Sequence, residues 1–96
     1  IAVHLYGYPC KMDEILEVKE KYNLYLIEDA AQSLGATYNR KKTGAIGDLG
    51  CFSFYPSKVI TCGEGGAIVT DDEDLALKLR MIRNHGILEG SSTFTQ

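Results

Sequence analysis

The chain has 96 residues, of which 45% are hydrophobic and 24% are charged, and its formal net charge is -3. These proportions are those of an ordinary globular protein and exclude a disordered chain, and the length allows one small domain at most. Neither the net charge nor any apolar run, none of which approaches the roughly 20 residues of a membrane-spanning helix, supports binding to nucleic acid or a membrane. We therefore expect neither among its partners.

The cysteines indicate the compartment. Cys10, Cys51 and Cys62 are odd in number and are not closely paired, which is typical of a reduced, cytoplasmic chain without a disulfide framework. Together with His4 and His85 they form neither a C-x-x-C nor an H-x-x-x-H spacing. A metal site is therefore not expected.

The first half of the chain alternates strand and helix. The apolar run "AVHLY" predicts a strand over residues 2–6, and the following "GYP" is typical of a turn. A helix is predicted over residues 12–22, because apolar side chains recur at helical spacing and acids lie near its amino end. Asn23 can end this helix in the left-handed conformation. Residues 24–28 contain the continuous apolar run "LYLI", which predicts a strand that is covered on both faces.

The middle of the chain is irregular and regular elements then return. "AAQSLGA" is turn-like, "ATY" fits a brief strand, and "NRKKTG" fits a polar hairpin-like loop. Residues 50–54 alternate as a strand does, and Pro56 ends it. A further strand is predicted over residues 66–70. A last helix is predicted over residues 72–84, since it opens at the acidic "DDED" and Gly86 follows its end.

This alternation predicts an α/β fold with a mostly parallel sheet. Ligands of such sheets bind beyond the carboxyl ends of the strands. Asp29 ends one predicted strand, and the stretch from Ser53 to Lys58 ends another. These positions are therefore the first candidates for a functional site.

Each candidate has an ordinary structural interpretation when it is taken alone. Asp29 can cap a helix, Ser53 can be a satisfied core hydroxyl, and Lys58 can be a solvated surface charge. Gln32 alone indicates nothing, and the glycines of "GEGG" can form a tight turn. The stretch "GAIGDLG" lacks the spacing and the strand–helix context of a dinucleotide fingerprint.

Together, the same residues meet the needs of a pyridoxal phosphate site. This cofactor requires an amine to bind its aldehyde and a carboxylate to keep its pyridine nitrogen protonated. It also requires donors for its phenolic oxygen and its phosphate. Lys58 supplies an amine and Asp29 a carboxylate. Gln32 supplies an amide and Ser53 a hydroxyl.

Three stretches carry a resemblance to a known family. "IEDAAQSLGA", "GAIGDLGCFSFYPSKVITCGEGGAIVT" and "LRMIRNHG" resemble, in order and separation, the DegT/DnrJ/StrS family of nucleotide-sugar aminotransferases. The resemblance implies a partial fold-type-I large domain, with a mostly parallel sheet, flanking helices and one antiparallel strand at residues 66–70. It also implies that residues 1–96 are a single fragment of this cofactor-binding domain, without its N-terminal part and the smaller C-terminal domain.

The resemblance implies a role for each candidate. Lys58 matches the lysine of the family's S-F-x-x-x-K stretch, which binds the cofactor covalently and later moves the proton. It is thus both the catalytic residue and a cofactor-binding one. Asp29 and Gln32 match the acid and the amide of E-D-A-A-Q, which hold the pyridine nitrogen and the ring oxygen. Ser53 matches the serine that contacts the phosphate.

The resemblance also implies a reaction for the full-length protein. An amino group passes from glutamate, or a similar donor, to a keto sugar carried on a nucleotide, and the enzyme is a homodimer. The fragment alone is expected to be inactive. Two alternatives remain: a dehydratase relative, although that branch carries histidine where Lys58 lies, and a truncated or proteolysed piece with only a structural or assembly role.

Overall fold

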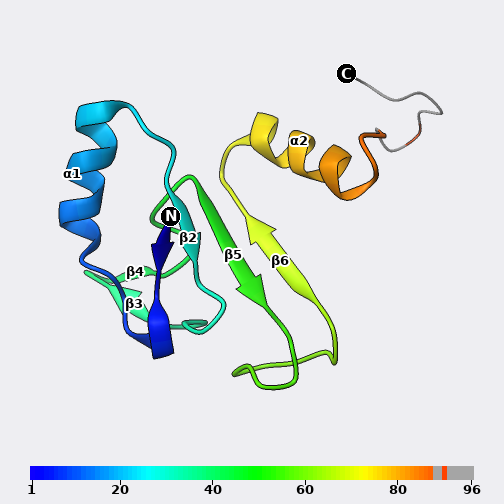
Figure 1. Ribbon diagram of the computed structural model, residues 1–96, viewed down its shortest axis with the longest axis horizontal. Helices are drawn as coiled ribbons and strands as arrows, with labels where there is room; N and C mark the ends of the chain where they lie inside the picture. The colour runs from blue at the N-terminus through cyan, green and yellow to red at the C-terminus, as the bar shows by residue number, and fades with distance from the viewer. Residues whose placement is uncertain (88–89, 91–96) are drawn as a thin grey trace.

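The computed structural model describes residues 1–87 and 90. A four-stranded sheet has the order β1-β2-β5-β6, and two further strands form a separate hairpin (Figure 1). The strands of the sheet are β1 (Ala2–Val3), β2 (Ile27–Asp29), β5 (Leu49–Ser53) and β6 (Gly66–Val69), and those of the hairpin are β3 (Thr37–Tyr38) and β4 (Lys41–Lys42). The helices are α1 (Met12–Tyr22) and α2 (Glu73–Arg83). Within the described residues, no helix has the length and apolar character to cross a membrane.

The sheet confirms the predicted topology. β1, β2 and β5 run parallel, whereas β6 is antiparallel to β5. In this register Asp29 lies between Val3 and Cys51, and Ser53 lies beside Gly66. Because side chains alternate along a strand, Asp29, Cys51 and Ser53 belong to one face of the sheet. The carboxyl ends of β2 and β5 therefore meet at the edge where the site was predicted.

The predicted strand over residues 2–6 is wrong beyond its second residue. β1 ends at Val3, and Leu5–Gly7 forms a 3₁₀ turn. The middle residue of that turn, Tyr6, has a left-handed backbone with φ of 54°. A bulky side chain does not favour this conformation. The turn predicted at "GYP" therefore begins two residues earlier than the sequence indicated.

The strand predicted over residues 24–28 begins later than expected, since β2 spans Ile27–Asp29. Asn23 ends α1 with φ of 50°, as predicted. The backbone N–H of Leu24 then donates to the carbonyl of Lys19 at 2.9 Å and completes the helix end. β2 therefore begins only beyond the residues that complete the end of α1.

The remaining elements lie within one residue of their predicted bounds. The hairpin predicted at "NRKKTG" is also confirmed. Asn39 and Arg40 connect β3 to β4 with φ of 47° and 67°. Two successive left-handed residues are the requirement of a two-residue type I′ turn, which asparagine tolerates well.

A buried carboxylate on β2 joins three segments of the chain. Oε1 of Glu28 accepts hydrogen bonds from Nε2 of His4 at 3.0 Å and from the backbone N–H of Gly44 at 2.7 Å. Oε2 accepts from the backbone N–H groups of Ile46 at 2.7 Å and Gly47 at 2.6 Å. The side chain is fully buried. These bonds tie the segment after β1 and the loop before β5 to the middle of the sheet.

The imidazole in this network is neutral. Nδ1 of His4 accepts the backbone N–H of Cys10 at 3.1 Å, so the proton of the ring is on Nε2, which donates it to Glu28. Burial by itself would raise the pKa of Glu28. The three backbone N–H groups and the imidazole outweigh that effect and hold the pKa below its ordinary value.

The apolar core lies on the same side of the sheet, under α1. Ala2, Met12 and Leu26 form its buried centre. The partly buried side chains around them are Cys10, Ile15, Leu16, Tyr38 and Ile46. In Figure 1, α1 lies beside the β1 side of the sheet, whereas α2 lies beyond the end of β6 and buries none of its residues. Asp29 and Ser53 are thus on the face turned away from the core.

We predict that Glu28→Gln lowers the free energy of unfolding by about 2–6 kcal/mol at neutral pH. One carboxylate oxygen becomes an NH₂ group, which leaves two buried N–H donors unpaired, and each orphaned donor costs about 1–3 kcal/mol. Urea unfolding measured by circular dichroism gives the difference. The matched control is Glu14→Gln, whose carboxylate pairs with Lys11 in solvent, and it should change stability by less than about 0.5 kcal/mol.

The difference in stability between the unsubstituted protein and Glu28→Gln should depend on pH. The pKa of Glu28 is lower in the folded protein than in the unfolded chain, so its contribution to stability is present above the ordinary glutamate pKa. That contribution is lost as the pH falls through the lowered pKa. The stability gap between the unsubstituted protein and Glu28→Gln should therefore close in acid. A gap that stayed constant with pH would show that the charge of Glu28 contributes nothing.

Candidate functional site

Asp29 is the last residue of β2, and its carboxylate faces the side of the sheet that Cys51 shares. Burial raises the pKa of the Cys51 thiol, and the negative charge of Asp29 raises it further. The backbone of Asp29 is fixed because its carbonyl accepts the N–H of His4 at 3.0 Å. The neighbouring Ala30 N–H donates to the carbonyl of Cys51 at 2.9 Å. The carboxylate is therefore held at the strand end from both sides.

Only one oxygen of the Asp29 carboxylate is used within the described residues. Oδ1 accepts the backbone N–H of Ala31 at 3.1 Å, whereas Oδ2 has no partner in this part of the chain. The side chain is half-buried, so Oδ2 is available to a ligand. By comparison, each oxygen of the Glu28 carboxylate, one residue earlier, accepts two hydrogen bonds.

Gln32 follows Asp29 in a tight turn. The turn is closed by the N–H of Ser33, which donates to the carbonyl of Ala30 at 3.0 Å. Oε1 of Gln32 accepts the backbone N–H of Tyr6 at 2.7 Å. Its NH₂ group makes no hydrogen bond to any described residue. The carbonyl end of the amide is therefore directed at Tyr6, and the NH₂ end presents its donors away from it.

Ser53 and Lys58 lie where β5 ends. The hydroxyl oxygen of Ser53 accepts the backbone N–H of Tyr55 at a long 3.4 Å, and its proton has no acceptor among the described residues. Lys58 lies in the turn that follows, where its N–H donates to the carbonyl of Tyr55 at 2.9 Å. Its half-buried side chain has neither an acid nor a carbonyl partner within residues 1–87 and 90.

The loop that carries Lys58 is tied back to the sheet at Phe54. The N–H of Phe54 donates to the carbonyl of Gly65 at 2.8 Å. Its carbonyl accepts from the hydroxyl of Thr61 at 2.7 Å and from the N–H of Cys62 at 3.1 Å. The loop that carries Lys58 is thus anchored at both ends, whereas the Lys58 side chain has no partner among the described residues.

The four predicted residues therefore share one property. Each leaves a polar group unused within the described chain, and none of these groups is sealed from solvent, since no buried side-chain nitrogen or oxygen in the described residues lacks a partner. The unused groups are a carboxylate oxygen, an amide NH₂, a hydroxyl proton and an amine. This set fits pyridoxal phosphate, which presents a pyridine nitrogen, acidic oxygens and an aldehyde. The register brings Asp29 and Ser53 to one face, and the loops carrying Gln32 and Lys58 leave the same strand ends.

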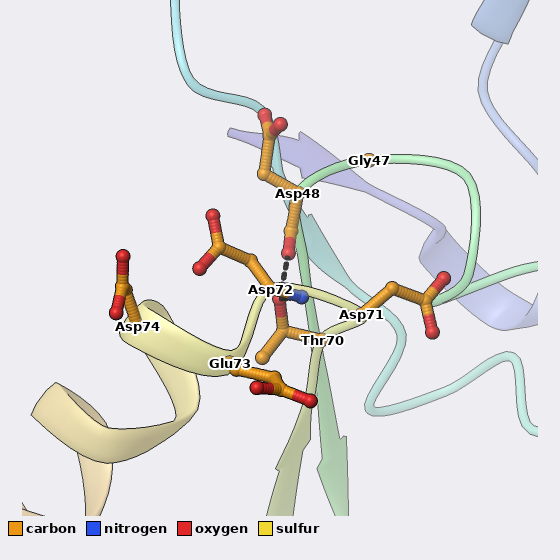
Figure 2. A pocket seen from close by; sticks show the side chains of 7 residues that line it. All are labelled: Gly47, Asp48, Thr70, Asp71, Asp72, Glu73 and Asp74. Carbon is orange, nitrogen blue, oxygen red and sulfur yellow. Dashed lines mark hydrogen bonds between the residues drawn. The ribbon is translucent and has the colours of Figure 1, made fainter.

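A second group of polar residues surrounds a cavity of about 550 Å³ at the opposite end of β5. The carboxylates of Asp71, Glu73 and Asp74 diverge around it instead of pointing at a common centre (Figure 2). Asp72 accepts the N–H of Leu75 at 2.9 Å and caps α2. The described residues contain no group of His, Cys, Asp or Glu side chains able to hold a metal ion. We therefore attribute this cavity to the meeting of three element ends, namely the start of β5, the end of β6 and the start of α2.

Asp48, which also lines this cavity, supports the fold. Its Oδ2 accepts the N–H of Leu26 at 2.6 Å, and its Oδ1 lies 3.1 Å from Nζ of Lys19. Burial raises the pKa of Asp48, but these two partners outweigh it and lower the pKa below its ordinary value. The hydroxyl of Thr70 donates to the backbone carbonyl of Asp48 at 2.8 Å (Figure 2). The sequence analysis did not single out this residue or Glu28, because the partners of both are distant in the chain.

The sheet topology is that of part of a fold-type-I pyridoxal phosphate enzyme. The sequence profile of the DegT/DnrJ/EryC1/StrS aminotransferase family matches residues 1–96. The chain belongs to this family, as the resemblance implied. Pyridoxal phosphate is the cofactor of the family.

Individual relatives agree with this assignment. GDP-perosamine synthase of Caulobacter vibrioides is 56% identical over 87 residues, which are 91% of this chain and 24% of that protein. The structure of a DegT DnrJ EryC1 StrS aminotransferase from Brucella abortus has a TM-score of 0.92 at 39% identity, covering 98% of this chain and 26% of that one. GDP-4-keto-6-deoxy-D-mannose-3-dehydratase of E. coli, with bound hydrated PLP, has a TM-score of 0.81 at 44% identity, covering 88% and 22%. The chain thus spans about a quarter of the length of these relatives.

The position of the Asp29 carboxylate can be tested through Cys51. In the cofactor-free protein, Asp29→Asn should lower the pKa of the Cys51 thiol, though not to its ordinary value, because burial remains. More thiolate should then form at pH 8, and alkylation by iodoacetamide should accelerate by up to about tenfold, the ratio that one pKa unit gives. Peptide mapping by mass spectrometry separates Cys51 from Cys10 and Cys62.

The control for this experiment is Glu17→Gln, which removes one exposed charge from α1 and should leave the reactivity of Cys51 unchanged. If Asp29→Asn left the alkylation rate at the level of this control, the carboxylate would not face Cys51. Asp29 would then not belong to the site proposed at the ends of β2 and β5.

Proposed function

We propose that the full-length protein containing this chain is a pyridoxal phosphate-dependent aminotransferase that acts on nucleotide-linked keto sugars. The observation that carries the proposal is the free amine of Lys58, anchored beyond β5, beside a strand that ends in the half-used carboxylate of Asp29. An amine without a partner is available for covalent bonding to a carbonyl. Membership of an aminotransferase family supports this reaction class.

The substrate class follows from relatives. GDP-perosamine synthase is named for a nucleotide-linked amino sugar, and it shares more than half of the aligned residues with this chain. The amino donor in this proposal is glutamate or a similar amino acid. In this proposal the full-length protein acts in the cytoplasm, as its unpaired cysteines indicate, and it is a homodimer, as the resemblance to the family implies.

We further propose that residues 1–96 are part of the large, cofactor-binding domain. The chain spans about a quarter of the length of its relatives, which supports this division. The resemblance to the family places further cofactor contacts, the smaller C-terminal domain and contacts from a partner subunit outside these residues. The chain alone is therefore proposed to be inactive.

The four site residues have distinct tasks in this proposal. Lys58 would hold the cofactor covalently, and its amine could then act as the acid and base that moves a proton at the substrate carbon. Asp29 stabilises the protonated pyridine nitrogen by its negative charge. Ser53 donates to the phosphate, and Gln32 donates to the ring oxygen. When bound, pyridoxal phosphate supplies the electron sink for the substrate carbanion.

A sugar dehydratase is the second candidate, because one of the similar structures is a 3-dehydratase. The resemblance implies that the dehydratase branch carries histidine where this chain has Lys58, so the lysine favours amination. A piece with only a structural or assembly role is a third candidate. Binding of pyridoxal phosphate to residues 1–96 alone would contradict that third candidate.

We predict that borohydride reduction of the full-length protein fixes pyridoxal phosphate covalently on Lys58. Lys58→Ala should abolish both the absorbance of lysine-bound cofactor and turnover, because no other free amine lies at the end of β5 in the described chain. Peptide mapping identifies the modified lysine. The matched control is Lys41→Ala on β4, which should keep the absorbance and the turnover. Modification of Lys41, Lys42 or Lys78 instead would contradict the assignment of Lys58.

We predict that Asp29→Asn leaves cofactor binding largely intact and lowers turnover by several orders of magnitude. An asparagine keeps the shape and one hydrogen bond, but it lacks the charge that keeps the pyridine nitrogen protonated. Proton removal from the substrate is the step that suffers, and each tenfold loss corresponds to about 1.4 kcal/mol of barrier. Steady-state kinetics with a keto sugar nucleotide measure the loss. Turnover near the unsubstituted rate, in a variant shown to hold its cofactor, would return Asp29 to a purely structural role.

A further inference from the structure

The turn after β1 contains an unusual backbone conformation. Tyr6 has φ of 54° and ψ of 26°, and Gly7 follows with φ of 80°. A glycine adopts this conformation readily, whereas a tyrosine does so only where its surroundings impose it. The ring of Tyr6 is 88% exposed and therefore gains little from packing within the described residues. The conformation has to be explained by the backbone.

The backbone of this turn is held against Gln32. The N–H of Tyr6 donates to Oε1 of Gln32 at 2.7 Å, and the N–H of Tyr8 closes the turn on the carbonyl of Leu5 at 3.0 Å. Gly7 lies so close to the same residue that an added Cβ would be 3.4 Å from the carbonyl of Gln32. Had Tyr6 continued β1 as an extended strand, its N–H would lie in the plane of the sheet. The turn that replaces the strand from Leu5 onward instead directs this N–H at the Gln32 side chain, and the left-handed conformation of Tyr6 then turns the chain so that Gly7 lies beside the Gln32 carbonyl.

The side chain of Gln32 is exposed, and the backbone that carries it is fixed by the next residue. The next residue, Ser33, is buried, and its hydroxyl donates to that of Thr43 at 3.0 Å. Rotation of the amide by 180° would place its NH₂ group against the N–H of Tyr6, two donors facing each other. The carbonyl end of the amide is therefore committed to Tyr6. The NH₂ group, which has no partner among the described residues, is the end left for a ligand.

We propose that the Leu5–Gly7 turn is a positioning element that holds the carbonyl end of the Gln32 amide, so that its NH₂ group faces the ligand as a hydrogen-bond donor. The position then selects an acceptor on the ligand, above all an oxygen that carries negative charge, such as the phenolic oxygen of pyridoxal phosphate. This inference rests on the proposed function for the identity of the ligand. The contact between Tyr6 and Gln32 is independent of it.

The contact is tested first in the cofactor-free, full-length protein. Hydrogen–deuterium exchange, read at single residues by mass spectrometry with electron-transfer fragmentation, reports the Tyr6 N–H. Gln32→Leu removes the acceptor and should accelerate exchange at Tyr6 by about tenfold, which corresponds to one ordinary hydrogen bond. Gln32→Glu keeps an acceptor and should retain the slow exchange. Equal exchange in Gln32→Leu and in the unsubstituted protein would overturn the proposal.

The donor role is tested by the same Gln32→Glu variant in the presence of pyridoxal phosphate. The variant keeps the bond to Tyr6 but turns an acceptor and a negative charge toward the ligand. Cofactor affinity should fall by about tenfold or more, and the absorbance of bound cofactor should shift. Unchanged affinity and absorbance would overturn the donor role. Absence of binding even in the unsubstituted protein would instead refute the proposed function and leave the exchange result standing.

A matched pair of variants separates the backbone of Tyr6 from its ring. Tyr6→Gly and Tyr6→Val both remove the ring, but glycine tolerates the left-handed conformation and a β-branched residue does not. Tyr6→Gly should keep the cofactor affinity of the unsubstituted protein, whereas Tyr6→Val should lose about as much as Gln32→Leu. Equal cofactor affinity in the two variants would overturn the role of the backbone conformation.

Discussion

The carboxylate of Glu28 lies fully buried between β1 and β5, and such a charge is tolerated only because donors surround it. Three of these donors are backbone N–H groups of the loop before β5, so the loop cannot move along β2 without leaving the charge unpaired. The register between β2 and β5 is fixed by this requirement. A slip of one residue would turn Asp29 to the opposite face. The position of the site acid thus follows from the burial of its neighbour.

The adjacent acids Glu28 and Asp29 show how the fold and the site divide the polar groups of one strand. Alternation along β2 sends one side chain to the core face and the other to the open face. The first has both oxygens saturated, and the second keeps one oxygen free within the described residues. Gln32 repeats this division within a single amide, since its carbonyl is used by the fold and its NH₂ is not. The polar groups available for chemistry are those that make no hydrogen bond within the fold.

Sequence patterns predicted those parts of the fold that depend on neighbours in the chain. Helical periodicity predicted the bounds of α1, and the polar stretch "NRKKTG" predicted the hairpin. The antiparallel direction of β6 came from the family resemblance alone. The role of Glu28 was not predictable, because its partners lie 16 to 24 residues away. The site residues were predicted from their place after strands, and the structure supports the shared face of Asp29 and Ser53.

Two strands are misplaced in the prediction from sequence, and one of them, the strand expected through Tyr6, falls beside the predicted site. For α1, β5, β6 and α2 the local preferences of the sequence agree with the structure, and such agreement is normal for a protein that folds to one state. A bulky residue held against its preference indicates that another demand prevails there, and functional sites are where such conflicts are expected. At the other end of β5, by contrast, Asp48 and Asp72 bind backbone groups of the fold. The two ends of one strand therefore separate polar groups that stabilise the protein from those left free to react.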